Sequence, residues 1–200
     1  MVQIKTYNSL PVNTKEVLRY AGCKGDTSFP KSILRECIKD AIKSISYKVC
    51  FDVFDLSIKE DECDFGAFCV KSKSLAKNLT GCKKAAVFSA TIGVGIDRLI
   101  SKYSSVSPLK AMIFSAIGAE QIESLCDMFC EDIKSEYETE IKPRFSPGYG
   151  DFDLSNQKNI FSCLNCQKNI GLTLTDSMIM VPSKSVTAVM GLCNDLRGNL

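Results

Sequence analysis

The sequence predicts an α+β fold in which a mixed or antiparallel β-sheet carries several helices. In some segments apolar residues recur at helical spacing, whereas others are short runs rich in Val, Phe and Tyr that are typical of strands. Strands that alternate with helices would normally indicate a parallel sheet. The last quarter, however, contains strands joined by a predicted hairpin turn over residues 182–185, which favours antiparallel pairing.

The first half of the chain alternates between predicted strands and helices. Alternation of apolar and polar residues predicts a strand over residues 2–6, and runs rich in apolar and aromatic residues predict strands over residues 47–57, 65–70 and 84–90. Capping residues, glycine stop signals and three- and four-residue apolar spacing predict helices over residues 14–20, from 31 through 42, over 74–79 and over 96–103. The turn over residues 91–95 lacks the full Gly-x-Gly-x-x-Gly spacing, so no dinucleotide site is predicted there.

A long helical segment follows in the middle of the chain. Ser107 and Pro108 form a good helix start, and the pattern continues into Tyr137. The apolar face of the first half is rotated by more than a third of a turn from that of the second half, which predicts a break or kink near Gly118. Pro143 then takes the chain out of helical conformation.

The final quarter is predicted to hold one helix and three strands. The helix begins at Asp153 or Ser155, runs through Asn169 and closes at Gly171, a usual place for a left-handed terminating residue. The alternating segments 172–175, 177–181 and 186–190 are predicted strands, and the hairpin turn joins the last two.

Composition indicates a single globular domain of residues 1–200, because 45% of the residues are hydrophobic and 24% are charged. The net charge is +2 with dispersed basic residues, so a nucleic-acid partner is not expected. The amino terminus has no apolar signal segment, and no stretch approaches the roughly eighteen apolar residues of a membrane span. We therefore expect no membrane association and a cytoplasmic location.

The eleven cysteines are expected to be reduced thiols, since their number is odd and the core is large enough to fold without disulfides. Cys163 and Cys166 form a Cys-x-x-Cys pair, which can be redox-active or bind metal. Zinc needs about four ligands, the chain has no histidine, and the pair lies late in a predicted helix. Two ordinary helix thiols are therefore the favoured interpretation, and no metal site is predicted. Cys126 and Cys130 could meet other thiols in space, but the sequence gives no positive reason to propose a cluster.

The segment of residues 144–150 is a basic, Gly/Pro-rich loop between two helical segments. Arg144 offers a planar fork of donors that suits a carboxylate or phosphate, and Pro147 with Gly148 shapes a tight turn that a ligand can approach. Tyr149 adds a ring face and a hydroxyl. On local chemistry alone, an ordinary turn with a solvated arginine is the simpler interpretation.

The motif Arg-x-x-x-Gly-Tyr at residues 144–149, followed by residues 171–191, resembles the activation domain of cobalamin-dependent methionine synthase. More closely, the chain resembles the free-standing activation proteins of anaerobic bacteria, through residues 16–25, 79–93 and 122–127 as well. The resemblance implies an α+β fold with a twisted antiparallel sheet and flanking helices.

The resemblance also implies a binding site for S-adenosylmethionine. Arg144 would meet the methionine carboxylate, and Glu123 would lie near the cationic part of the ligand. The rest of the ligand would face backbone polar groups and the tyrosine side chain of Ser146, Pro147, Gly148 and Tyr149. From periodicity alone Glu123 is a boundary residue at the edge of an apolar face, where solvation is the simpler interpretation.

Two features leave parts of this site open. The chain reads Gly150, Asp151, Phe152 where the larger enzyme has a stretch that contains Pro, Cys and His, so the resemblance does not define ligand pose or affinity. A further acidic residue of the family matches either Asp52 or Asp55.

The function implied is support of reductive methylation of cob(II)alamin on a methionine synthase or related corrinoid methyltransferase. Cobalamin would be carried by a partner met in trans, and a flavodoxin- or ferredoxin-type protein would donate the electron. The absence of histidine argues against a self-contained hydrolase and suits a ligand-presenting component of a methyltransferase in methionine biosynthesis. The alternatives are a ligand-free adaptor that caps a corrinoid protein and a thiol-based redox protein.

Overall fold

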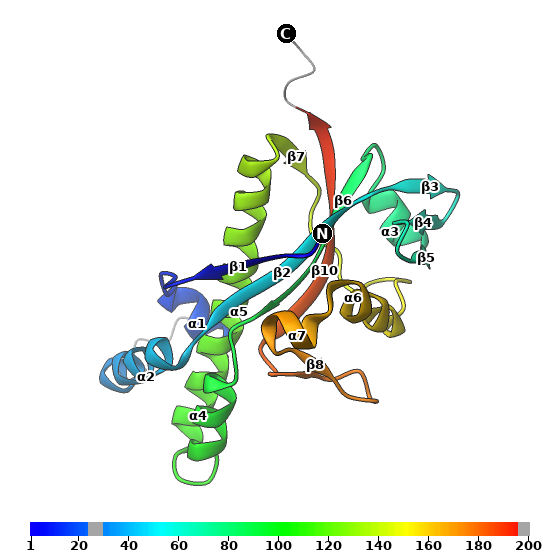
Figure 1. The fold of residues 1–200 in the computed structure, drawn as a ribbon. Coiled ribbons are helices and arrows are strands. Elements are labelled where there is room, and N and C mark those ends of the chain that lie inside the picture. The colour runs from blue at the N-terminus through cyan, green and yellow to red at the C-terminus, as the bar shows by residue number, and fades with distance from the viewer. Residues whose placement is uncertain (24–29, 196–200) are drawn as a thin grey trace.

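A computed structural model describes residues 1–23 and 30–195 and has a five-stranded antiparallel sheet at its centre (Figure 1). The strands lie in the order β1-β2-β6-β10-β7, and each neighbouring pair is antiparallel. Their bounds are β1 Gln3–Tyr7, β2 Tyr47–Asp55, β6 Lys84–Thr91, β7 Thr139–Ile141 and β10 Ser185–Asp195. The predicted α+β class with an antiparallel sheet and flanking helices is confirmed. The stretch 16–25 used in the resemblance ends outside the described residues.

Helices pack on both faces of this sheet, which explains why apolar residues of its central strands are buried on both faces. Along β6, Phe88 and its alternate neighbours enter one core, whereas Val87 enters the other. The first core is closed by α1 Thr14–Tyr20, α2 Lys31–Ser44, α4 Gly95–Tyr103 and α5 Pro108–Glu136. The second is closed by α3 Lys73–Asn78, α6 Gln157–Leu164, α7 Cys166–Ile170 and the small sheet of β3 Ser57–Lys59, β4 Glu62–Asp64 and β5 Cys69–Lys71.

The long helix α5 is unbroken over its 29 residues, so of the predicted break or kink near Gly118 the break is wrong. Both apolar faces are used because neighbours surround the helix: α1, α2 and α4 pack against it, and Phe129 meets the sheet residues Phe51 and Phe88. Gly118 serves close packing. A Cβ atom there would lie 2.8 Å from Cγ2 of Ile96, so the missing side chain admits a neighbour without breaking the helix.

Residues 65–70, predicted as one strand, mostly form the turn between β4 and β5. Gly66 has a φ of 74°, and its N–H donates to Oδ1 of Asp64 at 2.7 Å. Phe65 is buried in this turn and stacks on Phe68, so the apolar pattern reflects core packing of a turn. Only the end of the predicted segment, Cys69 and Val70, lies in a strand.

The last quarter differs from the prediction in three places. A short 3-10 turn, η1 Leu154–Asn156, comes first, and the predicted helix is divided into α6 and α7 because Asn165 adopts a left-handed φ of 48°. The hairpin lies between β8 Thr173–Leu174 and β9 Met180–Val181, so residues 182–185 are not its turn. They lead instead into β10, which pairs with β6, while the N–H and hydroxyl of Ser183 donate to Asp97 of α4. The short strand β7, which comes before this quarter of the chain, was not predicted either.

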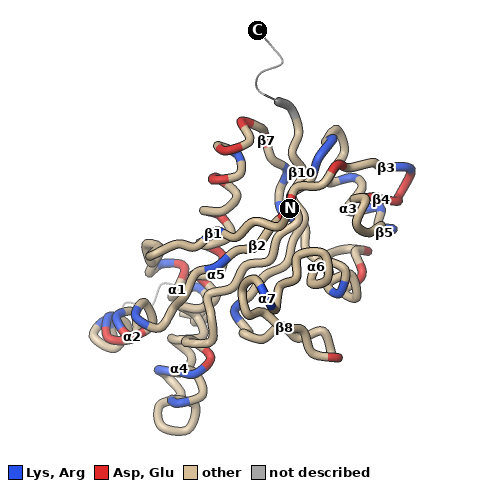
Figure 2. The backbone as a smooth tube through the Cα atoms, in the orientation of Figure 1, with Lys and Arg blue, Asp and Glu red and all other residues tan. Residues whose placement is uncertain are grey.

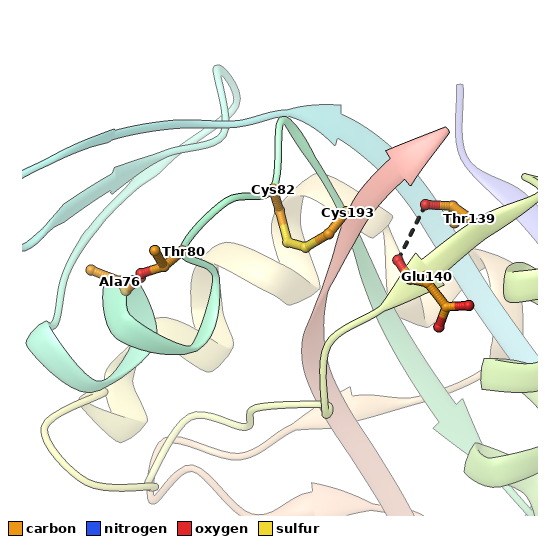
Figure 3. The surroundings of a disulfide bond; sticks show 6 residues. All are labelled: Ala76, Thr80, Cys82, Thr139, Glu140 and Cys193. Atoms are coloured by element: carbon orange, nitrogen blue, oxygen red, sulfur yellow. Dashed lines mark hydrogen bonds between the residues drawn. A yellow bond between two sulfur atoms is a disulfide. The ribbon is translucent and has the colours of Figure 1, made fainter. Parts of the chain in front are cut away.

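The expectation that all eleven cysteines are reduced thiols is wrong for one pair. Cys82, in the connection between α3 and β6, is joined to Cys193 near the end of β10 by a disulfide (Figure 3). The other nine cysteines are free. The bond ties the chain that leaves α3 to β10. The same strand borders residues 144–152, which we call the Arg144 loop.

Charged residues of both signs are interspersed along α2, α5 and the β3–β5 sheet (Figure 2). Within residues 1–23 and 30–195, no helix is long and apolar enough to cross a bilayer. The expectation that nucleic acid is not a partner stays a prediction.

Candidate functional site

The Arg144 loop is fixed to the edge of β10 where the chain leaves β7. The N–H of Lys142 donates to the carbonyl of Gly191 at 2.9 Å. Phe145 then forms an isolated bridge with Val189, in which each N–H donates to the other residue's carbonyl at 2.8 and 2.9 Å. Because neighbouring residues of an extended chain point to opposite faces, Phe145 enters the second core while Arg144 reaches toward α5.

Beyond Phe145 the loop closes on itself through backbone hydrogen bonds. The N–H of Tyr149 donates to the carbonyl of Ser146 at 3.1 Å, and the N–H of Gly148 donates to the carbonyl of Phe152 at 2.7 Å. Gly148 has a φ of 95°, a conformation that favours glycine. Pro147 is buried, whereas 58% of Tyr149 is exposed, so the tyrosine side chain is available to a ligand.

Arg144 is held by two carboxylates from α5. Its Nη2 donates to Glu123 and its Nη1 donates to Asp127, each at 2.5 Å. The two acidic residues are four apart, so they share one face of the helix. The side chain of Arg144 is only 25% exposed, but those of Glu123 and Asp127 are 44% and 69% exposed. The acidic half of this cluster therefore faces solvent.

The electrostatics of the cluster favour a ligand with more positive than negative charge. Burial of the guanidinium opposes its charged form, but hydrogen bonds to Asp127 and Glu123 outweigh burial and raise the pKa of Arg144. One cation with two carboxylates leaves a net charge of about −1. Burial raises the pKa of the neighbouring Cys126 and Cys130 thiols, so neither is a thiolate nucleophile at neutral pH.

A second anchor holds the far end of the loop. The carboxylate of Asp151 accepts hydrogen bonds from Ser72 Oγ at 2.7 Å, from the N–H of Lys73 at 2.8 Å and from the N–H of Ser74 at 3.0 Å. The hydrogen bond from Ser72 and those from the two N–H groups lower the pKa of Asp151 well below its usual range. The candidate site is therefore a loop pinned to β10, α5 and α3.

This chain matches a family model described as "Vitamin B12 dependent methionine synthase, activation domain" over residues 68–195, which is more than half of its 200 residues. The chain belongs to this family. The matched region contains Glu123, Arg144 and residues 146–149, and it also contains Asp127 and Asp151.

A solved structure agrees with the activation-domain assignment. The chain is similar to the protein in "Crystal Structure of the MetH Reactivation Domain bound to AdoHcy", with a TM-score of 0.67 and 13% identity over 96% of this chain and 78% of that one. At this identity the likeness establishes the fold. No curated protein matches the chain.

Two residues of the candidate site were missed by sequence reasoning. Asp127 had a usable signal, because it lies one helical turn after Glu123 and at the end of the stretch 122–127 that carries the resemblance. Asp151 had none, since the residues that it contacts lie 77 to 79 positions earlier in the chain. Of the two early acidic candidates, Asp52 accepts a hydrogen bond from the amino group of Met1 at 3.1 Å, and Asp55 ends β2.

The Cys-x-x-Cys pair lies in the second core of the activation domain. Cys166 is buried, and its thiol donates to Ser89 Oγ at 3.2 Å, with the Cys50 sulfur 4.0 Å away. Cys163 donates to the carbonyl of Ile160 at 3.4 Å. Across the part of the chain that the structure describes, no group of three or more Cys, Asp or Glu side chains is arranged to hold a metal ion.

Proposed function

We propose that this chain binds S-adenosylmethionine at the Arg144 loop and supports reactivation of a cobalamin-dependent methionine synthase or related corrinoid methyltransferase. The observation that carries the proposal is the cluster of Arg144, Glu123 and Asp127, in a loop whose Tyr149 side chain is exposed. Membership of the activation-domain family supports the same role.

The residues present fit the ligand. Arg144 has five N–H donors, and its bonds to the two acidic residues leave others for the ligand carboxylate. The exposed carboxylates of Glu123 and Asp127 would attract the ammonium and sulfonium groups. Tyr149 and the backbone around Gly148 would contact the remainder, where the missing side chain of glycine allows close approach.

The chain's own contribution is binding and orientation. S-adenosylmethionine would supply an electrophilic methyl group to reduced cobalt on the partner, after a flavodoxin- or ferredoxin-type donor has given one electron to cob(II)alamin. Because transfer of a methyl group from sulfur to cobalt moves no proton, the chain needs no acid or base of its own, which agrees with its lack of histidine.

The proposal extends to the chain's setting. Following the resemblance to free-standing activation proteins, we propose that residues 1–200 act as one domain and meet the cobalamin-bearing partner in trans. The cytoplasmic location and the electron donor remain predictions.

The test is anaerobic mixing of the chain with a cobalamin-loaded synthase fragment, a reductant and S-adenosylmethionine, followed by visible spectroscopy. We expect the spectrum of methylcobalamin to appear faster when the chain is present. The matched control omits the chain. Equal rates in the two samples would contradict the proposal and favour an adaptor that only caps the corrinoid protein.

A further inference from the structure

We propose that Asp151 is a positioning residue that seats the Arg144 loop on α3 and thereby keeps its ligand-binding turn in shape. This inference rests on the proposed binding of S-adenosylmethionine by that loop. It assigns a role to a residue where the chain departs from the pattern of the larger enzyme.

The contact between Asp151 and α3 is dense and directional. One carboxylate accepts three hydrogen bonds, from Ser72 Oγ and from the N–H groups of Lys73 and Ser74. Hydrogen bonds to an ionised acceptor are about twice as strong as those between neutral groups. The lowered pKa of Asp151 means that the carboxylate keeps its charge at neutral pH. The connection is therefore present under the conditions in which the ligand would bind.

The preceding residue shows that the loop backbone itself lies against α3. Gly150 has a φ of 54°, and a Cβ atom built on it would lie 2.7 Å from Ser74 Oγ. A Cβ atom at this position would also lie 3.1 Å from Cβ of Ser74, so a side chain would crowd the helix even if the Ser74 hydroxyl rotated away. Gly150 and Asp151 together hold the loop against α3. Gly150 leaves space for the helix, and Asp151 accepts hydrogen bonds from it.

The helix that receives the loop is itself fixed to the central sheet. Leu75 of α3 is fully buried, and the chain that leaves α3 is tied through the Cys82–Cys193 disulfide to β10 (Figure 3). The start of the loop is bridged to Val189 of the same strand. The loop, α3 and β10 are thus each connected to the other two. Asp151 connects the loop to α3, through three hydrogen bonds.

Loss of this link would leave the distal half of the loop with its internal turn bonds alone. The ligand would then have to order Gly148 and Tyr149 on binding, and ordering lost freedom weakens affinity. We expect Asp151→Ala to raise the dissociation constant for S-adenosylmethionine by about tenfold. Asp151→Asn, which keeps an accepting oxygen but loses the charge, should recover part of the loss.

The first measurement is calorimetric titration of these variants with S-adenosylmethionine. Asp153→Ala is the matched control, because Asp153 is also exposed but its carboxylate accepts from the nearby Ser155 and not from α3. Ser72→Ala removes one of the three donors to Asp151 and also the helix cap that Ser72 Oγ forms with the N–H of Leu75. When it is added to Asp151→Ala, the link is already lost, so any further loss of affinity reports the cap alone. General loss of stability would give additive losses instead. Wild-type affinity in Asp151→Ala would overturn the inference and leave the proposed function intact.

The second measurement needs no ligand. Hydrogen exchange of the amides of Gly148, Tyr149 and Phe152 reports the turn, and exchange at Phe145 reports the bridge to β10. Asp151→Ala should speed exchange in the turn and leave the bridge unchanged. Unchanged exchange in the turn would overturn the positioning role. If the wild-type chain binds no S-adenosylmethionine, the proposed function fails, and faster exchange would then show a structural tether without a ligand role, which also overturns the inference.

Discussion

At the scale of single residues, Arg144 is an unusual arginine because two carboxylates from one helix hold it from the same side. Glu123 and Asp127 satisfy its charge and fix its direction, yet both remain partly open to solvent. The cluster keeps a net negative charge of about one unit. A ligand that brings one carboxylate and two cationic groups complements it better than a neutral zwitterion does.

This difference predicts selectivity between two ligands of almost equal size. Glu123→Gln and Asp127→Asn should each weaken S-adenosylmethionine by roughly three- to tenfold and S-adenosylhomocysteine by less, because the latter lacks the positive sulfonium. Parallel titrations with both ligands measure the ratio. Glu131→Gln, an exposed position one turn beyond Asp127 on α5, is the control and should leave both affinities unchanged. Equal losses for the two ligands would rule out charge selection.

Sequence reasoning placed most of the candidate site because its parts are local. Arg144 and residues 146–149 are contiguous, and Glu123 lies on a helix whose periodicity is readable. The partner that Asp151 finds on α3 depends on tertiary packing, and no local pattern encodes it. The choice of site residues remains a prediction until a ligand is measured.

At the scale of elements, α5 shows why the switch of apolar face misled the prediction. A rotating apolar face signals a break only when one neighbour covers the helix, and α5 has helices on one side and the sheet on another. The prediction of a hairpin turn at residues 182–185 was also wrong because of a tertiary contact. The polar Ser183 in this segment donates to Asp97 of α4, and the segment leads into β10. Strand β1 was readable from its alternation, and β2 and β6 were readable because they are rich in apolar and aromatic residues.

Two glycines, Gly95 at the start of α4 and Gly118 within α5, should respond differently to substitution by alanine. A Cβ at Gly95 would lie 1.9 Å from the carbonyl oxygen of Ser44, which is backbone and cannot rotate away. Gly95→Ala should therefore lower the free energy of unfolding by about 3 kcal/mol or more. Gly118→Ala meets only the side chains of Ile96 and Lys184, and its gain in helix propensity of about 1 kcal/mol offsets part of the clash. Urea unfolding midpoints of the two variants decide, and equal midpoints would contradict this packing.

At the scale of the whole molecule, the two cores bury several groups that ionise only at high pH. Burial raises the pKa of Tyr47 to about 12, of Cys37 and Cys63 to about 11, and of Cys163 to about 12. Each group is neutral when protonated, so the folded chain holds its protons at pH values where an unfolded chain has released them.

The sign of the resulting pH dependence follows directly. Stability from these groups is fully present below about pH 7.5, where thiols and tyrosines are protonated in both states. It should fall as the pH rises from about 8 to 12, because the unfolded chain then binds fewer protons. Urea unfolding at successive pH values, with the Cys82–Cys193 disulfide kept intact, measures the slope. Tyr47→Phe should make the slope shallower above pH 10, and a flat profile through pH 11 would contradict the burial described.

The most direct measurement of the central claim is calorimetric titration of the wild-type chain, Arg144→Lys and Arg144→Ala with S-adenosylmethionine. We expect the wild type to bind, Arg144→Lys to bind more weakly because a point charge cannot fork, and Arg144→Ala to lose about a hundredfold in affinity. Circular dichroism confirms that the variants are folded. No heat from the wild type, or equal affinity in all three proteins, would contradict a ligand site at this loop.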